Sequence, residues 1–214
     1  MSVYMTEDEQ VELLKSWWKK YNSVIIVSIS ILLLAISGFK FFLWKHEKKM
    51  SAASVAYEHM MVSVANGDTN AVKSYSETLI SKYGSTVYAD AARLTLAKNA
   101  VDTHKYKIAK NLLEKICKQC RAKVILDIAR IRLARILIQE KDFTYALAEL
   151  AKVENESYLP IINELKGDIS ALSGKTEEAV SYYKKAIGGV DTSGIGNLFL
   201  EMKSNDIISI KKPK

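Results

Sequence analysis

Residues 24–43 read VIIVSISILLLAISGFKFFL, an apolar run in a chain whose other segments are polar or mixed. About 20 residues at about 1.5 Å each cover the roughly 30 Å hydrocarbon core of a bilayer. The single charged residue of the run, Lys40, lies near its end, where a long side chain can reach the headgroups. Aromatic residues flank the run, as in the belts at membrane interfaces: Trp17, Trp18, Tyr21 and Trp44. We expect a transmembrane helix over residues 24–44.

The segment before this run differs from the start of a cleaved secretory signal, which is short and basic. Residues 1–23 carry four acidic side chains. We therefore expect the helix to be retained as an anchor, with residues 1–23 as a tail on one side of the bilayer. Three lysines precede the run and three follow it within six residues. The positive-inside rule thus leaves the orientation open.

The rest of the chain has the composition of a helical protein. The whole sequence holds only 9 Gly and 2 Pro, and Ala, Leu, Ile, Lys and Glu are abundant. Of the net charge of +7, an excess of +5 (24 basic minus 19 acidic) lies beyond Met50, which is typical of solvated helix surfaces. The densest basic group alternates with apolar residues of a helix core, so no nucleic-acid partner is expected. It consists of Arg121, Lys123, Arg130, Arg132 and Arg135.

A repeat of about 34 residues runs through residues 45–190. Each of three units contains two small residues that are 12 positions apart. A large residue stands four positions after the second small residue, and an apolar residue stands three positions after the large one. The three sets are Ala97, Ala109, Leu113, Ile116; Ala134, Ala146, Leu150, Val153; and Gly167, Ala179, Tyr183, Ala186. Tetratricopeptide repeats have this spacing, because small residues let two helices approach and large ones fill the groove to the next unit. The spacing predicts an all-α chain in which a single transmembrane helix precedes a TPR-like α-solenoid.

Turn signals fall where this alignment requires them. Polar or glycine-containing triplets separate the two helices of each unit, at residues 66–68, 103–105, 140–142 and 173–175. The first triplet separates an upstream pair of helices, expected over residues 55–65 and 71–83. Gly174 suits the left-handed backbone at a helix end, and Pro160 suits the first turn of a helix.

The last segment, residues 191–214, departs from the repeat. Several glycines precede a short apolar stretch over residues 197–203, which contains Leu198, Leu200 and Met202. We expect this stretch to form a helix that caps the last repeat. A lysine-rich, disordered tail is expected to follow it.

Catalytic and metal-binding signatures are missing from the sequence. Cys117 and Cys120 form a C-K-Q-C motif, but no second pair of ligands accompanies them and the surroundings are helical. The two thiols are either free at a helix end or joined in a disulfide, and the sequence leaves both interpretations open. No nucleophile elbow, zinc-binding HExxH or phosphate loop occurs. We expect no catalytic residue, cofactor, metal or small-molecule substrate.

The layout of the chain resembles the YfgM-like family, an ancillary subunit of the bacterial Sec translocon. The matching segments cover nearly the whole chain: 8–12 with Lys15, 17–18, 51–57, 130–135, 165–168 and 200–203. The resemblance implies a single-pass inner-membrane protein with a cytoplasmic N-terminus and periplasmic repeats. It also implies two partners, the Sec translocon channel and a membrane-anchored periplasmic prolyl isomerase chaperone, and a role in passing exported proteins to periplasmic chaperones. The Cys117–Cys120 pair is not part of the resemblance, so no role is carried onto it.

From the residues themselves, an interaction module is the leading hypothesis, because stacked helices offer a groove for extended or helical segments. The candidate partner-binding residues are exposed side chains on the first helices of the units: Lys98, Asn99, Asp102 and Arg135. Small residues in the apolar run are candidates for packing against a partner helix in the bilayer: Ser30, Ser37 and Gly38. The alternative is a membrane-tethered regulatory scaffold whose tail sequesters a signalling partner, although residues 8–20 also suit docking on lipid.

Overall fold

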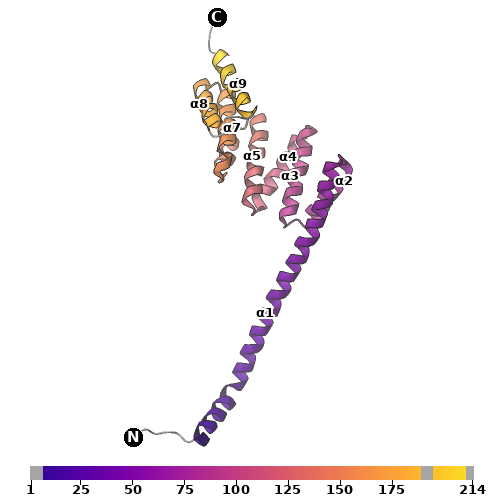
Figure 1. Cartoon of the computed structure of the whole chain (residues 1–214), viewed down its shortest axis with the longest axis vertical. Coiled ribbons are helices and arrows are strands. Elements are labelled where there is room, and N and C mark those ends of the chain that lie inside the picture. Colours follow the sequence, from indigo (N-terminus) through magenta and orange to yellow (C-terminus); the bar gives the residue numbers. More distant parts are fainter. Residues whose placement is uncertain (1–6, 189–194, 211–214) are drawn as a thin grey trace, which may run out of the picture. The chain divides into compact units, whose positions relative to one another are not determined.

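The computed structural model describes residues 7–188 and 195–210, and all of its regular structure within them is helical (Figure 1). By contacts, the chain forms two compact units, Met1–Ala52 and Ala53–Lys214. The elements are α1 (Glu7–Ala65), α2 (Thr69–Lys82), α3 (Val87–Asp102), α4 (Tyr106–Gln119), α5 (Lys123–Gln139), α6 (Phe143–Leu150), the 3₁₀ turn η1 (Glu156–Tyr158), α7 (Leu159–Leu172), α8 (Thr176–Gly188) and α9 (Ile195–Ile210). The predicted fold class is confirmed.

Helix α1 contains the apolar run and has the length and composition of a membrane-crossing helix. None of the residues in its most apolar part is buried by protein. The Ser30 hydroxyl donates a hydrogen bond to the Ile26 carbonyl oxygen at 2.8 Å, which satisfies a polar group that lipid cannot. At the two ends of the run, the Trp17 and Tyr21 rings lie 5.5 Å apart and the Lys48 ammonium lies 5.0 Å from the Trp44 ring.

Four helix hairpins of the second unit turn in the same way. In each, one residue adopts a left-handed backbone: Gly67 (φ 70°), His104 (φ 57°), Lys141 (φ 63°) and Gly174 (φ 75°). Its N–H bonds to the carbonyl three residues earlier, and the next N–H bonds to the carbonyl five residues earlier, as in a Schellman motif. The left-handed backbone predicted at Gly174 therefore recurs at two non-glycine residues.

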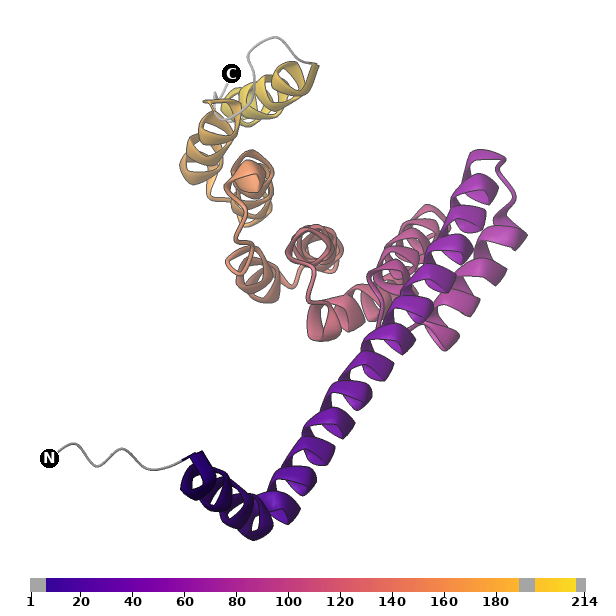
Figure 2. The ribbon, with the colours of Figure 1, turned by 60° about the horizontal axis from the view of Figure 1, so that its bottom comes forward.

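The small residues of the repeat lie where the helices cross. Ala97, Ala109, Ala134, Ala146 and Ala179 are all buried, and the large residues Leu113, Leu150 and Tyr183 are buried in the same clusters. Successive pairs from α3 to α8 follow one another along a curved stack (Figure 2). The core is continuous from α3 to α7, because buried residues of all these helices belong to one cluster. This burial is the one that the 12–4–3 spacing predicts.

The Tyr183 ring packs closely against the backbone of Gly167 in α7. A Cβ atom at this position would lie 2.6 Å from the Tyr183 ring, which is 2% exposed. Only glycine therefore lets the ring pack on the helix. The Tyr183 hydroxyl donates to Asp168 Oδ1 at 2.7 Å, and burial followed by this hydrogen bond raises the pKa of Tyr183.

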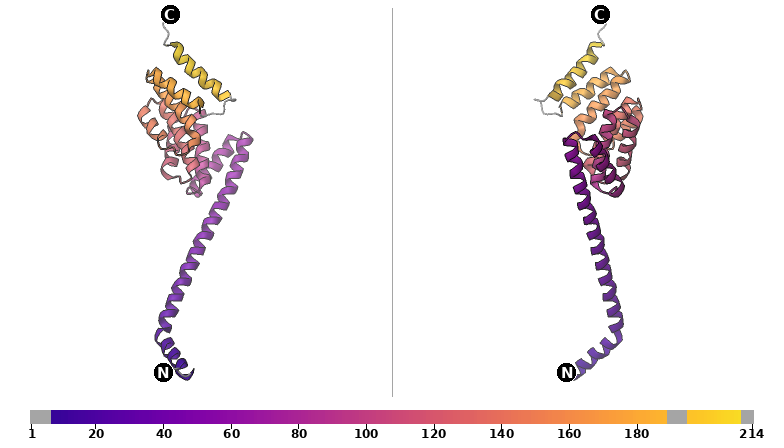
Figure 3. Two further views of the ribbon diagram at one scale, coloured as in Figure 1. Left: turned by 60° about the vertical axis from the view of Figure 1, so that its left-hand side comes forward. Right: turned by 90° about the vertical axis from the view of Figure 1, so that its right-hand side faces the viewer.

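Helix α9 packs on α8 (Figure 3) and is longer than the predicted helix over residues 197–203. Leu200 is buried against α8, while Leu198 and Met202 are exposed. The helix continues because Ile207 reaches the same cluster two turns after Leu200. The predicted lysine-rich tail and most of the glycines before α9 lie outside the described residues. The domain boundaries at residues 23, 44 and 190 stay predictions.

A four-residue clasp also holds α9. Lys203 Nζ donates to Glu164 Oε1 at 2.9 Å and to Asp168 Oδ1 at 2.9 Å, and it lies 5.8 Å from the centre of the Tyr183 ring. Burial lowers the pKa of Lys203, but the hydrogen bonds to Glu164 and Asp168 outweigh it, so the net shift is upward. We call Lys203, Glu164, Asp168 and Tyr183 the C-terminal clasp.

Candidate partner-binding site

The four predicted partner-binding residues do not lie at one site. Lys98 of α3 and Arg135 of α5 line one cleft of about 260 Å³. Asn99 lines a separate groove between α2, α3 and α4, and Asp102 lines neither. Adjacent helical residues point about 100° apart, so Lys98 and Asn99 face different neighbours. The structure thus brings together two of the four.

The cleft between α3, α4 and α5 has an apolar floor and a basic rim. Four of its apolar lining residues belong to the repeat core or pack against it, namely Ala97, Tyr106, Leu113 and Ile136, and the fifth is the more exposed Val101. Its rim carries three cations and one amide: Lys98, Arg132, Arg135 and Gln139. We call this set the basic cleft.

Arg132 is a cleft residue that was not among the predicted site residues. It is half-buried, and its Nη1 donates to the Leu94 carbonyl oxygen of α3 at 3.3 Å. Burial, and after it the neighbouring Arg135 guanidinium, lowers the pKa of Arg132. The signal that could have found it is the i, i+3, i+7 spacing of Arg132, Arg135 and Gln139, which places all three on one helical face.

The cations of the basic cleft have no carboxylate among its lining residues. Over residues 7–188 and 195–210, Lys98, Arg132 and Arg135 form no ion pair. Like charges that face each other without a counter-ion repel. The cleft is therefore a positively charged pocket whose electrostatics favour an anionic ligand.

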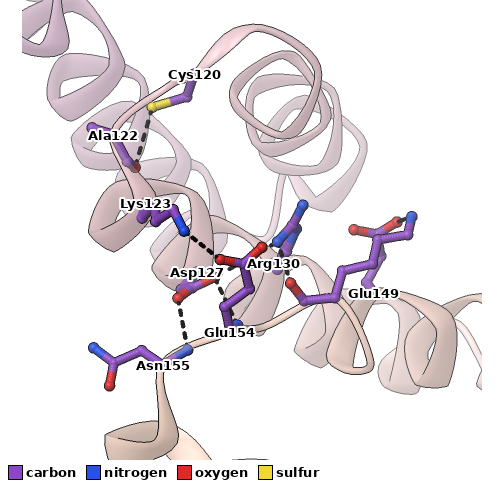
Figure 4. Close-up of polar contacts among 9 residues, drawn as sticks. Cys120, Ala122, Lys123, Asp127, Arg130, Glu149, Glu154 and Asn155 are labelled. Carbon is purple, nitrogen blue, oxygen red and sulfur yellow. Dashed lines mark hydrogen bonds and ion pairs between the residues drawn. The ribbon is translucent and has the colours of Figure 1, made fainter.

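The other basic residues of α5 contact the chain itself (Figure 4). The Asp127 carboxylate accepts the backbone N–H groups of Glu154 and Asn155 at 3.4 and 3.3 Å. Arg130 lies 3.7 Å from Asp127 Oδ1 and donates to the Lys152 carbonyl oxygen. Arg130 thus helps to fasten the segment after α6 to α5. Of the basic group noted in the sequence, Lys123 and Arg130 contact the chain itself and Arg132 and Arg135 line the cleft, while Arg121 is exposed outside it.

The two cysteines are unpaired in this structure. Burial raises the pKa of both thiols to about 11, and Cys120 Sγ donates to the Ala122 carbonyl oxygen at 3.7 Å. Thiols with such a high pKa are poor nucleophiles near neutral pH. Within the described part of the chain, no group of three or more His, Cys, Asp or Glu side chains is placed to hold a metal ion. The disulfide stays a prediction, as does the packing role of Ser30, Ser37 and Gly38.

Known proteins match this chain along most of its length. The family model for the tetratricopeptide repeat-like domain matches residues 15–209. The ancillary SecYEG translocon subunit of Haemophilus influenzae is 26% identical over 186 residues, which are 87% of this chain and 91% of that protein. Its namesake from Escherichia coli is 24% identical over 209 residues (97% and 99%), and that from Neisseria gonorrhoeae is 22% identical over 208 residues (97% and 100%).

These matches take in both the apolar helix and the repeats. They agree with the burial of the repeat positions and with the four similar turns. The resemblance to the YfgM-like family is confirmed by them. The chain belongs to the tetratricopeptide repeat-like domain family.

Proposed function

We propose that this protein is a single-pass inner-membrane subunit that associates with the Sec translocon through binding surfaces and without catalysis. The observation that carries this proposal is the near full-length match to relatives named ancillary SecYEG translocon subunit. A match limited to the repeats would support the fold alone, since repeat solenoids serve many functions. Here the match includes the apolar helix as well, so the anchor and the binding domain occur together in the relatives.

The finer part of the proposal concerns the orientation of the protein in the membrane and a second partner besides the translocon. In it, the N-terminus lies in the cytoplasm and the repeats lie in the periplasm, next to a membrane-anchored prolyl isomerase chaperone. The protein then helps to pass exported chains from the channel to periplasmic chaperones. The resemblance to the YfgM-like family supports this part, and the basic cleft supplies a surface on which a partner segment can bind.

Site-specific photo-crosslinking in native membranes tests the proposal. A photoreactive residue at Ser37 probes the small face of the apolar helix, and one at Phe39 is a matched control on about the opposite face at similar depth. A third probe at Lys98 reports on the repeats. We expect crosslinks to the translocon channel from Ser37 more than from Phe39, and crosslinks to periplasmic proteins from Lys98.

Either of two results would contradict the proposal. Absence of the channel from the partners captured at both Ser37 and Phe39 would remove the association with the translocon. Exclusive capture of cytoplasmic proteins at Lys98 would reverse the orientation, and a regulatory scaffold would then be the better explanation. Alkaline phosphatase fused after Lys214, which is active only outside the cytoplasm, gives an independent measure of sidedness.

A further inference from the structure

We propose that the basic cleft binds a peptide segment of a partner protein in which acidic residues flank one aliphatic or aromatic residue. This inference rests on the proposed function, because it names the kind of segment that a binding subunit would recognise. Three properties of the cleft support it: its volume, its charge and the fixed positions of its side chains before binding.

The volume of the cleft fits a side chain better than a whole ligand. At about 260 Å³ it is smaller than the roughly 300–1,000 Å³ of typical small-molecule pockets. The floor is apolar, with Val101, Tyr106 and Ile136 among its residues. The hydroxyl of Tyr106 is 3.1 Å from His104 Nδ1, which satisfies it and leaves the ring to line the floor. One apolar side chain of a longer partner therefore suits this space.

The positive charge of the rim favours acidic residues on either side of that apolar residue in the partner. Lys98, Arg132 and Arg135 surround the apolar floor without any carboxylate among them. Guanidinium groups bind carboxylates through paired N–H donors, so acidic residues on either side of the apolar residue would meet Arg132 and Arg135. A bound carboxylate would also relieve the repulsion between these two guanidinium groups.

The cleft is partly organised before any partner arrives. The bond from Arg132 to the Leu94 carbonyl holds that guanidinium on α3, and three of the floor residues are buried in the repeat core. Preorganisation lowers the entropic cost of binding. Gln139, on the same face of α5 as both arginines, adds an amide that can bond to the backbone of the partner.

Peptide binding to the full chain in zwitterionic-lipid nanodiscs tests this inference. The probe is a fluorescent peptide with a central Leu between Asp and Glu residues, and fluorescence anisotropy measures its affinity. Two further peptides replace either the acids by their amides or the Leu by Ser. We expect both replacements to weaken binding, the first by about tenfold or more, since charge-assisted hydrogen bonds are lost.

A pair of variants locates the site. Arg135→Glu reverses a charge in the cleft and should weaken binding by about tenfold or more. Arg121→Glu, which reverses an exposed arginine outside it, should leave the affinity unchanged. Arg135→Lys should recover part of the affinity, because it keeps the charge but not the paired donors. Circular dichroism checks that the variants are folded.

Several results would overturn the inference. If the amide peptide bound as tightly as the acidic peptide, the cleft would not recognise charge. If Arg121→Glu weakened binding as much as Arg135→Glu, the attraction would be non-specific. Anionic-lipid vesicles or an oligonucleotide that bound through Arg135, without any binding of the acidic peptide, would assign the cleft to another ligand. Crosslinking of the channel from Ser37 does not depend on the cleft. A protein that crosslinks to the channel but does not bind the peptide would therefore contradict this inference and leave the proposed function intact.

Discussion

The C-terminal clasp and the basic cleft use cations in opposite ways. In the clasp, one ammonium group, that of Lys203, lies between two carboxylates and beside an aromatic ring. In the cleft, two guanidinium groups and an ammonium group surround an apolar floor with no carboxylate among them. The pKa of Lys203 is raised because its carboxylate partners outweigh burial, whereas burial and then the Arg135 charge lower the pKa of Arg132.

This contrast separates residues that stabilise the fold from residues left for a partner. A cation whose charge is matched within the chain lowers the free energy of the folded state and has little left to offer a ligand. A cation without a match contributes little to folding, or opposes it slightly, and is available for binding. Four substitutions or conditions can test this division, from the largest expected effect to the smallest.

The largest effect on the free energy of unfolding is expected from adding a methyl group at Gly167, against the Tyr183 ring. Gly167→Ala places a methyl group 2.6 Å from a ring that cannot move without disturbing its bond to Asp168. We expect the free energy of unfolding to fall by about 2 kcal/mol despite the better helix propensity of alanine. Urea unfolding of the full chain in detergent, followed by circular dichroism, measures it. Gly188→Ala is the control, since no atom lies within 4 Å of its added methyl group, and an equal loss there would contradict the explanation.

A smaller loss should follow when the clasp is opened. Lys203→Met keeps the length of the side chain but leaves Glu164 and Asp168 without their cation. The side chains of all three are about a quarter exposed, at 23–25%. We therefore expect about 1.5 kcal/mol of destabilisation, below the roughly 3–5 kcal/mol of a fully buried pair. Hydrogen exchange of the α9 amides should accelerate more than that of α5, and uniform acceleration would argue against a local clasp.

High pH should remove the contribution of the clasp without any mutation. The folded-state pKa of Lys203 lies above its ordinary value of 10.5. The stabilisation by the ammonium group is therefore complete below about pH 10.5 and is lost as the pH rises through the folded pKa. The difference in urea midpoint between wild type and Lys203→Met should shrink above that pH. A difference that stayed constant to pH 12 would show that Lys203 acts through packing.

The smallest effect is expected in the basic cleft. Arg135→Gln removes an exposed cation that has no carboxylate partner among residues 7–188 and 195–210. The free energy of unfolding should change by less than about 0.5 kcal/mol, and any change should be a gain from reduced repulsion with Arg132. Thermal unfolding at low and high salt checks this. A loss above about 1 kcal/mol would place Arg135 among the residues that stabilise the fold.

The sequence predicts the helices and their crossings well, because small residues are required wherever two helix backbones approach closely. Ala134 and Gly167 align by sequence alone, since larger side chains at these positions would collide with the next helix. The full length of α9 was missed, although Leu200 and Ile207 are spaced as one helical face. That spacing was obscured by Leu198 and Met202, which are apolar but exposed.

The site was predicted less completely than the fold. Of the four predicted residues, Lys98 and Arg135 line the basic cleft, whereas Asn99 lines another groove and Asp102 lines neither. The partner-binding role of all four stays a prediction. Arg132 was not among the predicted site residues because it alternates with core residues in the sequence, although its i, i+3, i+7 spacing with Arg135 and Gln139 places all three on one helical face. Its long side chain carries the charge away from a half-buried position, and the hydrogen bond to the Leu94 carbonyl oxygen of α3 shows where that charge lies.

The short Schellman turns also favour local folding of the second unit. Most of its helix contacts join neighbours along the chain, so each hairpin closes a small loop and little entropy is lost at each step. The clasp is less local, because Lys203 bonds to Asp168 and Glu164, which lie 35 and 39 residues earlier in the chain. We therefore expect the hairpins to form early and the docking of α9 to complete the unit.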